Sequence, residues 1–355
     1  MLARMSLHVG DVVRVAAVLV ALAALPLAAS MRQGATPLPA LLDSYLTKHV
    51  KLTAQQRSQL LSGQPVTQML DADPSREVGV FGAVWVNASP AQYVALAQDI
   101  ERFESGGSFR VTKRISQPPR LEDFAALELP ADDVAALRNC QVGDCELKLG
   151  ESTLNRLKRE IDWKKSTAKA DVDALARRQA LQYVIGYLEG GNAQLAVYRD
   201  DKRPTFVAQE FASMIDRLPA LSEYLPDLKR YLLDFPKATL PKSSSFLYWQ
   251  EAQFGLKPTI RINHVVITEQ PTHVAMASKM IYASHYFWTA LELRVLVPDP
   301  ARGPGFWFAS VNRSRSDGLS GFTGQIIRGK VRGETEKGMT AALNSVKKRL
   351  ERPAA

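Results

Sequence analysis

The chain has 355 residues, of which 46% are apolar and 23% are charged. It is therefore long enough to bury one large core, and its composition excludes wholesale disorder. Lysine and arginine outnumber aspartate and glutamate by 45 to 36, a net charge of +9, which favours contact with anionic surfaces such as lipid headgroups.

The first thirty residues have the pattern of a secretory signal peptide. Arg4 and Arg14 precede an apolar run at 15–29, and Ala28-Ala29-Ser30 forms a small-residue exit. The run is short for a transmembrane helix, which needs about 20 residues, although an uncleaved membrane anchor stays open. We therefore predict a periplasmic or secreted protein, and export argues against nucleic acid as a partner.

The next segment predicts a leader and helices over 31–76, followed by a strand. Val78, Val80, Val84 and Val86 alternate with other apolar residues, which is typical of a strand that is buried on both faces. Ser89 and Pro90 then predict a helix start. A second strand is expected at "SFRVTKRI", 108–115.

The only cysteines, Cys140 and Cys145, are predicted to form a disulfide. Gly143 and Asp144 lie between them and favour a tight turn. An oxidising compartment would allow the bond, and a loop this short contributes about 2 kcal/mol in the chain-entropy treatment. No histidine lies close enough in sequence to indicate a metal site.

The second half of the chain predicts a helical block at about 150–240 and then a change of period. From Ser243 apolar residues alternate with a period of two in four stretches, which predicts successive antiparallel strands. The chain closes on a helix with Met339, Leu343 and Val346 on its buried side. We therefore predict an α+β fold with a curved antiparallel sheet, a long C-terminal helix and a large helical insertion, as one domain over 77–352.

This order of elements resembles the helix-grip superfamily of START-like lipid-transfer proteins and polyketide cyclases. The similar stretches are "VFGAVWVNASPAQYVALAQDIERFE" near the front and "KMIYASHYFWTALELRVLV", "FWFASVNRSRSDGL" and "MTAALNSVKKRLE" near the end. The resemblance implies a ligand pocket between the sheet and the C-terminal helix, and it transfers no catalytic residue and no cofactor. The helical block at 150–240 departs from the family pattern and puts the shape of that pocket in doubt.

Aromatic residues on the predicted strands are the candidate ligand-binding residues. The stretch 280–297 predicts one continuous strand, on which rings with polar tips share a face and suit an apolar pocket with a few hydrogen bonds. The alternative is that these rings only pack the sheet against helices. Arg313 and Arg315 point the same way and are candidates for an anionic headgroup, with ordinary surface ion pairs as the alternative. The candidates are Tyr248, Trp249, Tyr282, Tyr286, Trp288, Trp307, Arg313 and Arg315.

Few residues indicate catalysis. His264 and His285 lie on predicted strands without a metal-ligand pattern. The Ser-x-x-Lys sequence at Ser166–Lys169 lacks its companion motifs and is better explained as a polar linker. The sequence predicts no cofactor and no metal.

Three functions remain open at this point. The first is an exported, non-catalytic protein that binds a hydrophobic or amphipathic ligand, such as a lipid, between sheet and C-terminal helix. The second is a periplasmic enzyme for a bulky apolar substrate with His264 or His285 as general base. The third is a structural or assembly protein of the envelope that uses the helical block as a partner surface.

Overall fold

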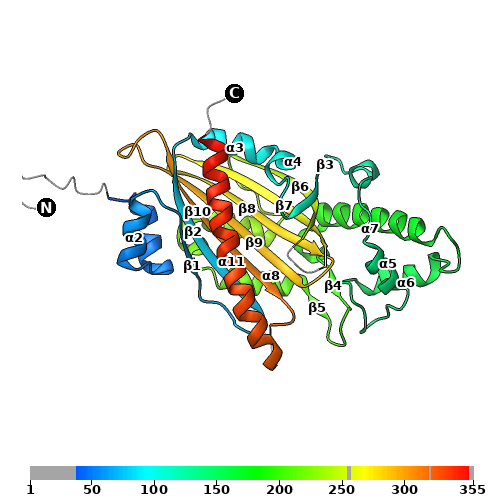
Figure 1. The fold of residues 1–355 in the computed structure, drawn as a ribbon. Helices are drawn as coiled ribbons and strands as arrows, with labels where there is room; N and C mark the ends of the chain where they lie inside the picture. The colour runs from blue at the N-terminus through cyan, green and yellow to red at the C-terminus, as the bar shows by residue number, and fades with distance from the viewer. Residues whose placement is uncertain (1–36, 254–256, 320, 352–355) are drawn as a thin grey trace, which may run out of the picture. The chain divides into compact units, whose positions relative to one another are not determined.

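The fold is described from a computed structural model (Figure 1). It covers residues 37–253, 257–319 and 321–351, without the side chains of 321–327. The predicted signal peptide at 1–30 lies outside these ranges. The segment before the main sheet contains α1 (Ala40–Tyr45), the π-helix η1 (Leu46–Val50), α2 (Ala54–Leu61) and the short strand β1 (Val66–Met69).

The centre of the fold is an eight-stranded antiparallel sheet with the strand order β1-β2-β10-β9-β8-β7-β6-β3. This sheet, together with the long C-terminal helix, confirms the predicted α+β architecture. All ten residues of β2 are buried, as expected for a strand with two apolar faces. The strands are β2 (Glu77–Val86), β3 (Phe109–Ile115), β6 (Ser243–Ala252), β7 (Thr259–Gln270), β8 (His273–Ala283), β9 (Phe287–Pro298) and β10 (Phe306–Ser316).

The stretch 280–297 is a hairpin and not the single strand that its pattern predicts. Strand β8 ends at Ala283, β9 begins at Phe287, and Tyr286 between them has a φ of 59°. No glycine or proline marks this turn. Tertiary contacts hold it instead, since Ser284 Oγ accepts a hydrogen bond from the Ile260 amide and its carbonyl accepts one from Lys148.

One face of the sheet, here called the α11 face, packs against α11 (Gly321–Leu350), α3 (Pro90–Gln98) and α4 (Ile100–Phe103) (Figure 1). The side chains of α11 that are described and buried are Met339, Leu343 and Val346. They meet β2 at Gly82, where an added Cβ would lie 2.6 Å from Met339 Cγ and 3.0 Å from Leu343 Cδ1. The absence of a side chain at Gly82 therefore lets the helix approach the sheet.

The opposite face, here called the block face, is covered by the other helices. Its apolar contacts form two clusters, one under α1, α8, α9 and α10 and one under α5, α6 and α7. Helices α6 to α10 occupy the region predicted as a helical block; α8 packs on β9 and β10, whereas α6 packs against α7. These elements are α5 (Ala131–Leu137), α6 (Glu151–Glu160), α7 (Ala168–Gly190), α8 (Val207–Asp216), α9 (Pro219–Tyr224), α10 (Pro226–Asp234), the 3₁₀ helices η2 (Leu121–Phe124) and η3 (Gly191–Gln194), and the pair β4 (Val197–Tyr198) and β5 (Thr205–Phe206).

Cys140 and Cys145 form the predicted disulfide. The loop between them turns at Gly143, whose φ is 87°, in the region that only glycine adopts without strain. The Gly143 amide donates to the Arg199 carbonyl and the Cys145 amide to the Asp200 carbonyl. The disulfide loop is thus fixed to the segment between β4 and β5.

Within the part of the chain that the structure describes, no helix combines the length and apolar character needed to cross a membrane.

We expect Gly82→Val to destabilise the protein by about 1–3 kcal/mol, because its side chain would overlap Met339 and Leu343 in a packed interface. Gly338→Ala is the matched control, since nothing lies within 4 Å of an added Cβ there and alanine favours a helix interior by about 1 kcal/mol. Urea unfolding should therefore give opposite signs for the two variants. Equal effects would contradict the close approach at Gly82.

Candidate functional site

An apolar cavity of about 60 Å³ lies on the block face, between α1, α9 and strands β9 and β10. All eleven lining residues carry aliphatic or aromatic side chains. The floor comes from strand residues with small or β-branched side chains, such as Val295, Ala309 and Val311, and the cover includes Leu41 and Tyr45. These short side chains do not fill the space beneath the two helices. The cavity adjoins the main apolar cluster of this face.

The cover of the cavity, α1 with η1, is anchored both by burial and by an ionic contact. Leu42, Leu46 and Val50 are buried in the core. At the surface, Glu223 of α9 contacts Lys48 Nζ at 2.6 Å and His49 Nε2 at 2.9 Å. The hydrogen bonds from Lys48 and His49 lower the pKa of Glu223 to about 2. The cover also contains a π-helix. This element is rare in proteins, and where it occurs it is often found at a functional site.

Two buried arginines follow the cavity along β10. Val311 lines the cavity, and Arg313 and Arg315 project from the same face of the strand. Both contact Glu77, and Arg315 Nη1 also contacts Glu210 Oε2 at 2.8 Å. The two cationic charges are therefore balanced by two carboxylates, in the core and not at the surface.

Arg313 keeps one donor without a partner. Its Nη2 donates to the Asp71 carbonyl at 2.9 Å and its Nη1 to Glu77, whereas the buried Nε has no hydrogen-bond acceptor among the described residues. Tyr45 lines the cavity close enough to Arg313 for its hydroxyl to feel the cationic charge, and burial raises the pKa of that hydroxyl. The arginines themselves do not line the cavity, so they lie beside it and not in its wall.

Trp307 precedes the cavity on β10. It pairs in register with Val297 of the cavity wall and packs edge-on against Trp85, with ring centroids 5.2 Å apart. Its Nε1 donates to Asp299 Oδ2 at 2.9 Å. Three of the predicted site residues, Trp307, Arg313 and Arg315, thus lie next to the cavity along one strand.

The other five predicted residues lie elsewhere. Tyr248 is buried on the α11 face. Trp249, Tyr282 and Trp288 pack in the second cluster of the block face. Tyr286 lies in the β8–β9 turn, where its hydroxyl accepts a hydrogen bond from the Lys257 amide. The eight candidates therefore belong to both faces of the sheet and do not line one pocket.

His264 lies in a closed environment beside a buried lysine. Its Nδ1 is 2.9 Å from the Tyr187 hydroxyl, and its Nε2 is buried without a partner among the described residues. Burial, with the Lys279 charge adding to it, lowers the pKa of His264 to about 3, so the imidazole is neutral at pH 7. His264 does not line the cavity described above, which weakens its case as a general base.

Lys279, the cross-strand partner of His264, is 1% exposed. It donates to Asn192 Oδ1, and its Nζ lies 4.2 Å from the centroid of the Phe211 ring. Burial lowers the pKa of Lys279 to about 7. The sequence analysis did not single out Lys279. The signal that could have found it is its position in the middle of the apolar stretch "VAMASKMIYA".

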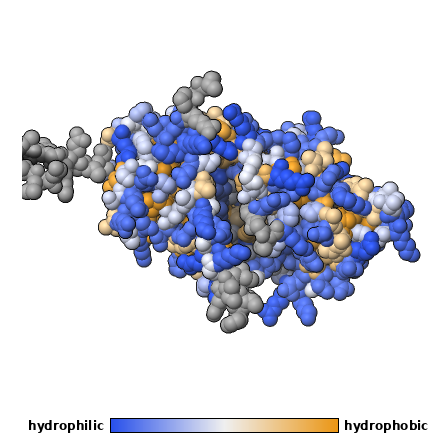
Figure 2. Space-filling model, in the orientation of Figure 1, coloured by the Kyte–Doolittle hydropathy of each residue, from blue (hydrophilic) through white to orange (hydrophobic). Residues whose placement is uncertain are grey.

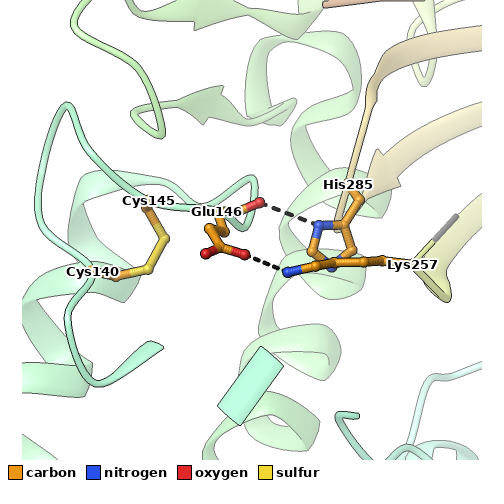
Figure 3. The surroundings of a disulfide bond; sticks show 5 residues. All are labelled: Cys140, Cys145, Glu146, Lys257 and His285. Atoms are coloured by element: carbon orange, nitrogen blue, oxygen red, sulfur yellow. Dashed lines mark hydrogen bonds and ion pairs between the residues drawn. A yellow bond between two sulfur atoms is a disulfide. The ribbon is translucent and has the colours of Figure 1, made fainter. Parts of the chain in front are cut away.

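His285 is clamped between segments on either side of the disulfide loop. Its Nε2 lies 2.9 Å from Asp133 Oδ2. Figure 3 shows its other contact, in which Nδ1 donates to the Glu146 carbonyl at 3.2 Å. Glu146 also pairs with Lys257 through its carboxylate. Both ring nitrogens of His285 are occupied, so it acts as a tie between α5, the disulfide loop and the β8–β9 turn. Asp133, which orients it, precedes His285 by 152 residues and could not be paired with it from the sequence.

Comparison with known proteins adds no functional information, because no protein-family model and no curated protein sequence matches the chain. The resemblance to helix-grip proteins therefore stays a prediction. Among the described residues, no group of histidine, cysteine and carboxylate side chains could hold a metal ion.

We expect Lys279→Met to change the pH dependence of stability. The pKa of Lys279 is about 7 in the folded state against 10.5 for an ordinary lysine, so the unfolded chain binds more protons between these values. The free energy of unfolding of the unmodified protein should therefore rise by about 1–3 kcal/mol between pH 7 and pH 9.5, relative to the variant. Urea unfolding at both pH values tests this, and parallel pH profiles for the two proteins would contradict it.

We expect Trp249→Ala to destabilise the protein by about 3–5 kcal/mol, the usual range for truncating a buried tryptophan. Trp249 is 1% exposed, stacks on Phe124, and donates from Nε1 to the Asp123 carbonyl at 2.8 Å. Trp288→Ala is the control. The Trp288 ring is only half-buried, so its truncation should reduce stability less than Trp249→Ala does. Thermal unfolding of both variants tests the order, and a Trp249→Ala variant of native stability would show that the ring is not a core residue.

Proposed function

We propose that this protein binds a hydrophobic or amphipathic ligand, such as a lipid, and that the apolar part of the ligand lies in the cavity between α1, α9, β9 and β10. The observation that carries this proposal is the wholly apolar lining of that cavity. Pockets for small molecules are mostly apolar with a few polar groups at fixed positions. The sequence led us to expect the ligand beside the C-terminal helix, whereas the cavity lies on the opposite face of the sheet.

The size of the cavity limits what fits while the cover is closed. An apolar cavity of about 150 Å³ stays dry and binds benzene, so a space of about 60 Å³ accepts only a short aliphatic segment. Each buried methylene contributes about 0.8 kcal/mol. A longer chain therefore requires α1 and η1 to move away from β9 and β10, against the burial of Leu42 and Leu46 and the contacts with Glu223.

The buried arginine next to the cavity favours an amphipathic ligand over a pure hydrocarbon, provided that the head of the ligand extends past Val311 toward Arg313. The Arg313 Nε group is a buried donor without an acceptor, and leaving such a donor unpaired costs about 1–3 kcal/mol. A carbonyl, ester or carboxylate oxygen on the ligand would accept from it. Because Glu77 and Glu210 already balance the two arginines, the ligand need not carry a full negative charge.

Export is part of the same proposal. The disulfide between Cys140 and Cys145 is compatible with an oxidising compartment, and the signal-like N-terminus supports delivery there. The C-terminal helix carries seven lysines and arginines against two glutamates, and Lys330, Arg332 and Lys348 among them are exposed. A basic exposed helix favours contact with an anionic membrane surface.

The two other functions have weaker support. An enzyme with a histidine base would need His264 or His285 beside a substrate site, and neither residue lines the cavity. An assembly protein would use the helical block as a free surface, but α7, α8 and α10 each bury apolar side chains on the sheet. No specific contact or cavity in the described residues favours either function.

Native mass spectrometry with organic extraction, on protein isolated from its own compartment, is the first test. We expect a bound lipid at near one-to-one ratio. Ala220→Trp should reduce its occupancy at least fivefold, because Ala220 of α9 lines the cavity and an indole would fill it. An empty native protein, together with no binding of added dodecanoic acid, would contradict the proposal.

Ala212→Trp provides the matched control. Ala212 lies on α8, is half-buried like Ala220, and does not line the cavity. Circular dichroism should show that both variants are folded, and only Ala220→Trp should lose lipid. Equal loss in both variants would mean that the lipid binds elsewhere.

A further inference from the structure

A second cavity, of about 270 Å³, lies at the edge of the sheet where strand β3 ends. Strand β3 pairs with β6 as far as Ile115 and Leu247, whereas β6 continues along β7 from Ser243. The chain leaves the sheet after Ile115, so no described strand covers the edge of β6 at Phe246, and a hollow forms there. The lining residues are Arg114, Ile115, Ser116, Gln117, Asp123 and Phe246.

This cavity differs from the apolar cavity of the block face in chemistry and in access. Four of its six lining residues are polar or charged, and Arg114 and Gln117 are exposed, so a ligand can reach it from solvent. Phe246 belongs to the α11 face. Figure 2 shows that hydrophilic residues make up most of the visible surface on the side of the molecule where α11 lies. A ligand on this side is therefore selected chiefly by polar contacts.

Arg114 supplies a fixed positive charge to the cavity. Its Nη1 donates to the Gln98 carbonyl at 2.7 Å, and its guanidinium carbon lies 4.3 Å from the centroid of the Phe246 ring. The nearby Glu101 pairs with Lys113 instead. No carboxylate in the described part of the chain pairs with the Arg114 guanidinium, so the side chain is oriented by neutral groups and keeps donors for a ligand.

Asp123 supplies a fixed negative charge to the same cavity. Its Oδ2 accepts hydrogen bonds from the Ser116 amide at 3.1 Å, from the Ser116 hydroxyl at 2.8 Å and from the Arg120 amide at 2.8 Å. Among the residues that the structure describes, no lysine or arginine side chain pairs with this carboxylate and no donor contacts its Oδ1. Neutral donors thus orient Asp123 and leave one oxygen open to a ligand.

We propose that this cavity binds a small zwitterion, such as a free α-amino acid. The carboxylate of the ligand accepts hydrogen bonds from Arg114, and its ammonium group donates to Asp123. The observation that carries the proposal is the pair of fixed, opposite charges that line one solvent-accessible cavity without an ion pair between them. This site lies apart from the apolar cavity, and it does not depend on the proposed binding of lipid.

The two charges decide the class of ligand. A simple anion that pairs with Arg114 is repelled by Asp123, and a simple cation that pairs with Asp123 is repelled by Arg114. A zwitterion is attracted by both residues, and hydrogen bonds between charged groups are roughly twice as strong as those between neutral groups. An apolar cavity of about 150 Å³ holds benzene, so a space of about 270 Å³ accommodates a molecule of amino-acid size.

Calorimetry on the full-length protein with the common L-amino acids tests this proposal. We expect at least one amino acid to bind. Its amide, which lacks the carboxylate, and its N-acetyl derivative, which lacks the ammonium group, should each bind at least about tenfold more weakly. No binding of any of these amino acids would overturn the proposal, and so would equal affinity for the amino acid and its two derivatives.

Two variants assign the contacts to single residues. Arg114→Gln should weaken binding of the amino acid by about tenfold or more without weakening binding of the amide further, because the amide already lacks the group that Arg114 contacts. Asp123→Asn keeps the acceptor for the Ser116 and Arg120 amides, and it should weaken the amino acid but not the N-acetyl derivative. It provides the test if circular dichroism shows that Arg114→Gln is unfolded. Unchanged amino-acid affinity in either folded variant would contradict the proposal.

Two controls separate this site from the rest of the molecule. Arg203→Gln makes the same change of charge at an exposed arginine between β4 and β5, and it should leave amino-acid affinity unchanged. Ala220→Trp, which fills the apolar cavity, should also retain amino-acid binding, so that failure of the lipid site and failure of this site are distinguishable. Loss of amino-acid binding in Ala220→Trp would place the ligand in the apolar cavity and overturn the proposal.

Discussion

The structure depends on one constraint: the central sheet is apolar on both faces, so both must be covered. Strand β2 is buried along its entire length, and its residues contribute to clusters on either side. Three helices cover the α11 face, and the remaining helices cover the block face. The large helical block is therefore a structural necessity of this sheet, because without it the apolar side chains of β6 to β10 on that face would meet water.

The molecule also buries several charged side chains, and they differ in the groups that compensate their charge. Arg313 and Arg315 share Glu77, and Arg294 lies between Glu104 and Glu292. Pairs of this kind roughly offset their own desolvation. Lys279 has no carboxylate partner among the described residues and instead contacts Asn192 and the Phe211 ring. It lies where the two apolar clusters of the block face meet, which ties its protonation state to the packing there.

The apolar cavity reflects the distribution of side chains on the sheet. On the block face, the apolar cavity exists because short side chains on β9 and β10 leave space beneath α1 and α9. On the α11 face, the buried Arg294 pairs with Glu104 and contacts the Tyr93 hydroxyl of α3. The same sheet thus has an apolar cavity on one face and a buried network around Arg294 on the other. The aromatic residues that the sequence predicted as one pocket lining are instead divided between the two faces of the sheet, where most of them pack in the apolar clusters.

The sequence by itself determined the class of fold and the local elements. The period-two alternation of β2 and β10, the Ser89–Pro90 helix start, the disulfide and the buried side of the C-terminal helix follow from neighbours within a few residues, and such signals are local. It did not determine the β8–β9 turn, because His285 and Ser284 are held there by Asp133, Lys148 and Ile260, which are distant in the chain. Nor could it determine the sites. Strand register and helix docking decide which face of the sheet a side chain lies on, which residues it contacts and how deeply it is buried. Trp249 and Tyr248 are adjacent in the chain, yet the pleat sends one to the block face and the other to the α11 face. Only the tertiary structure decides which face of a sheet holds a cavity and which side chains are buried beside it.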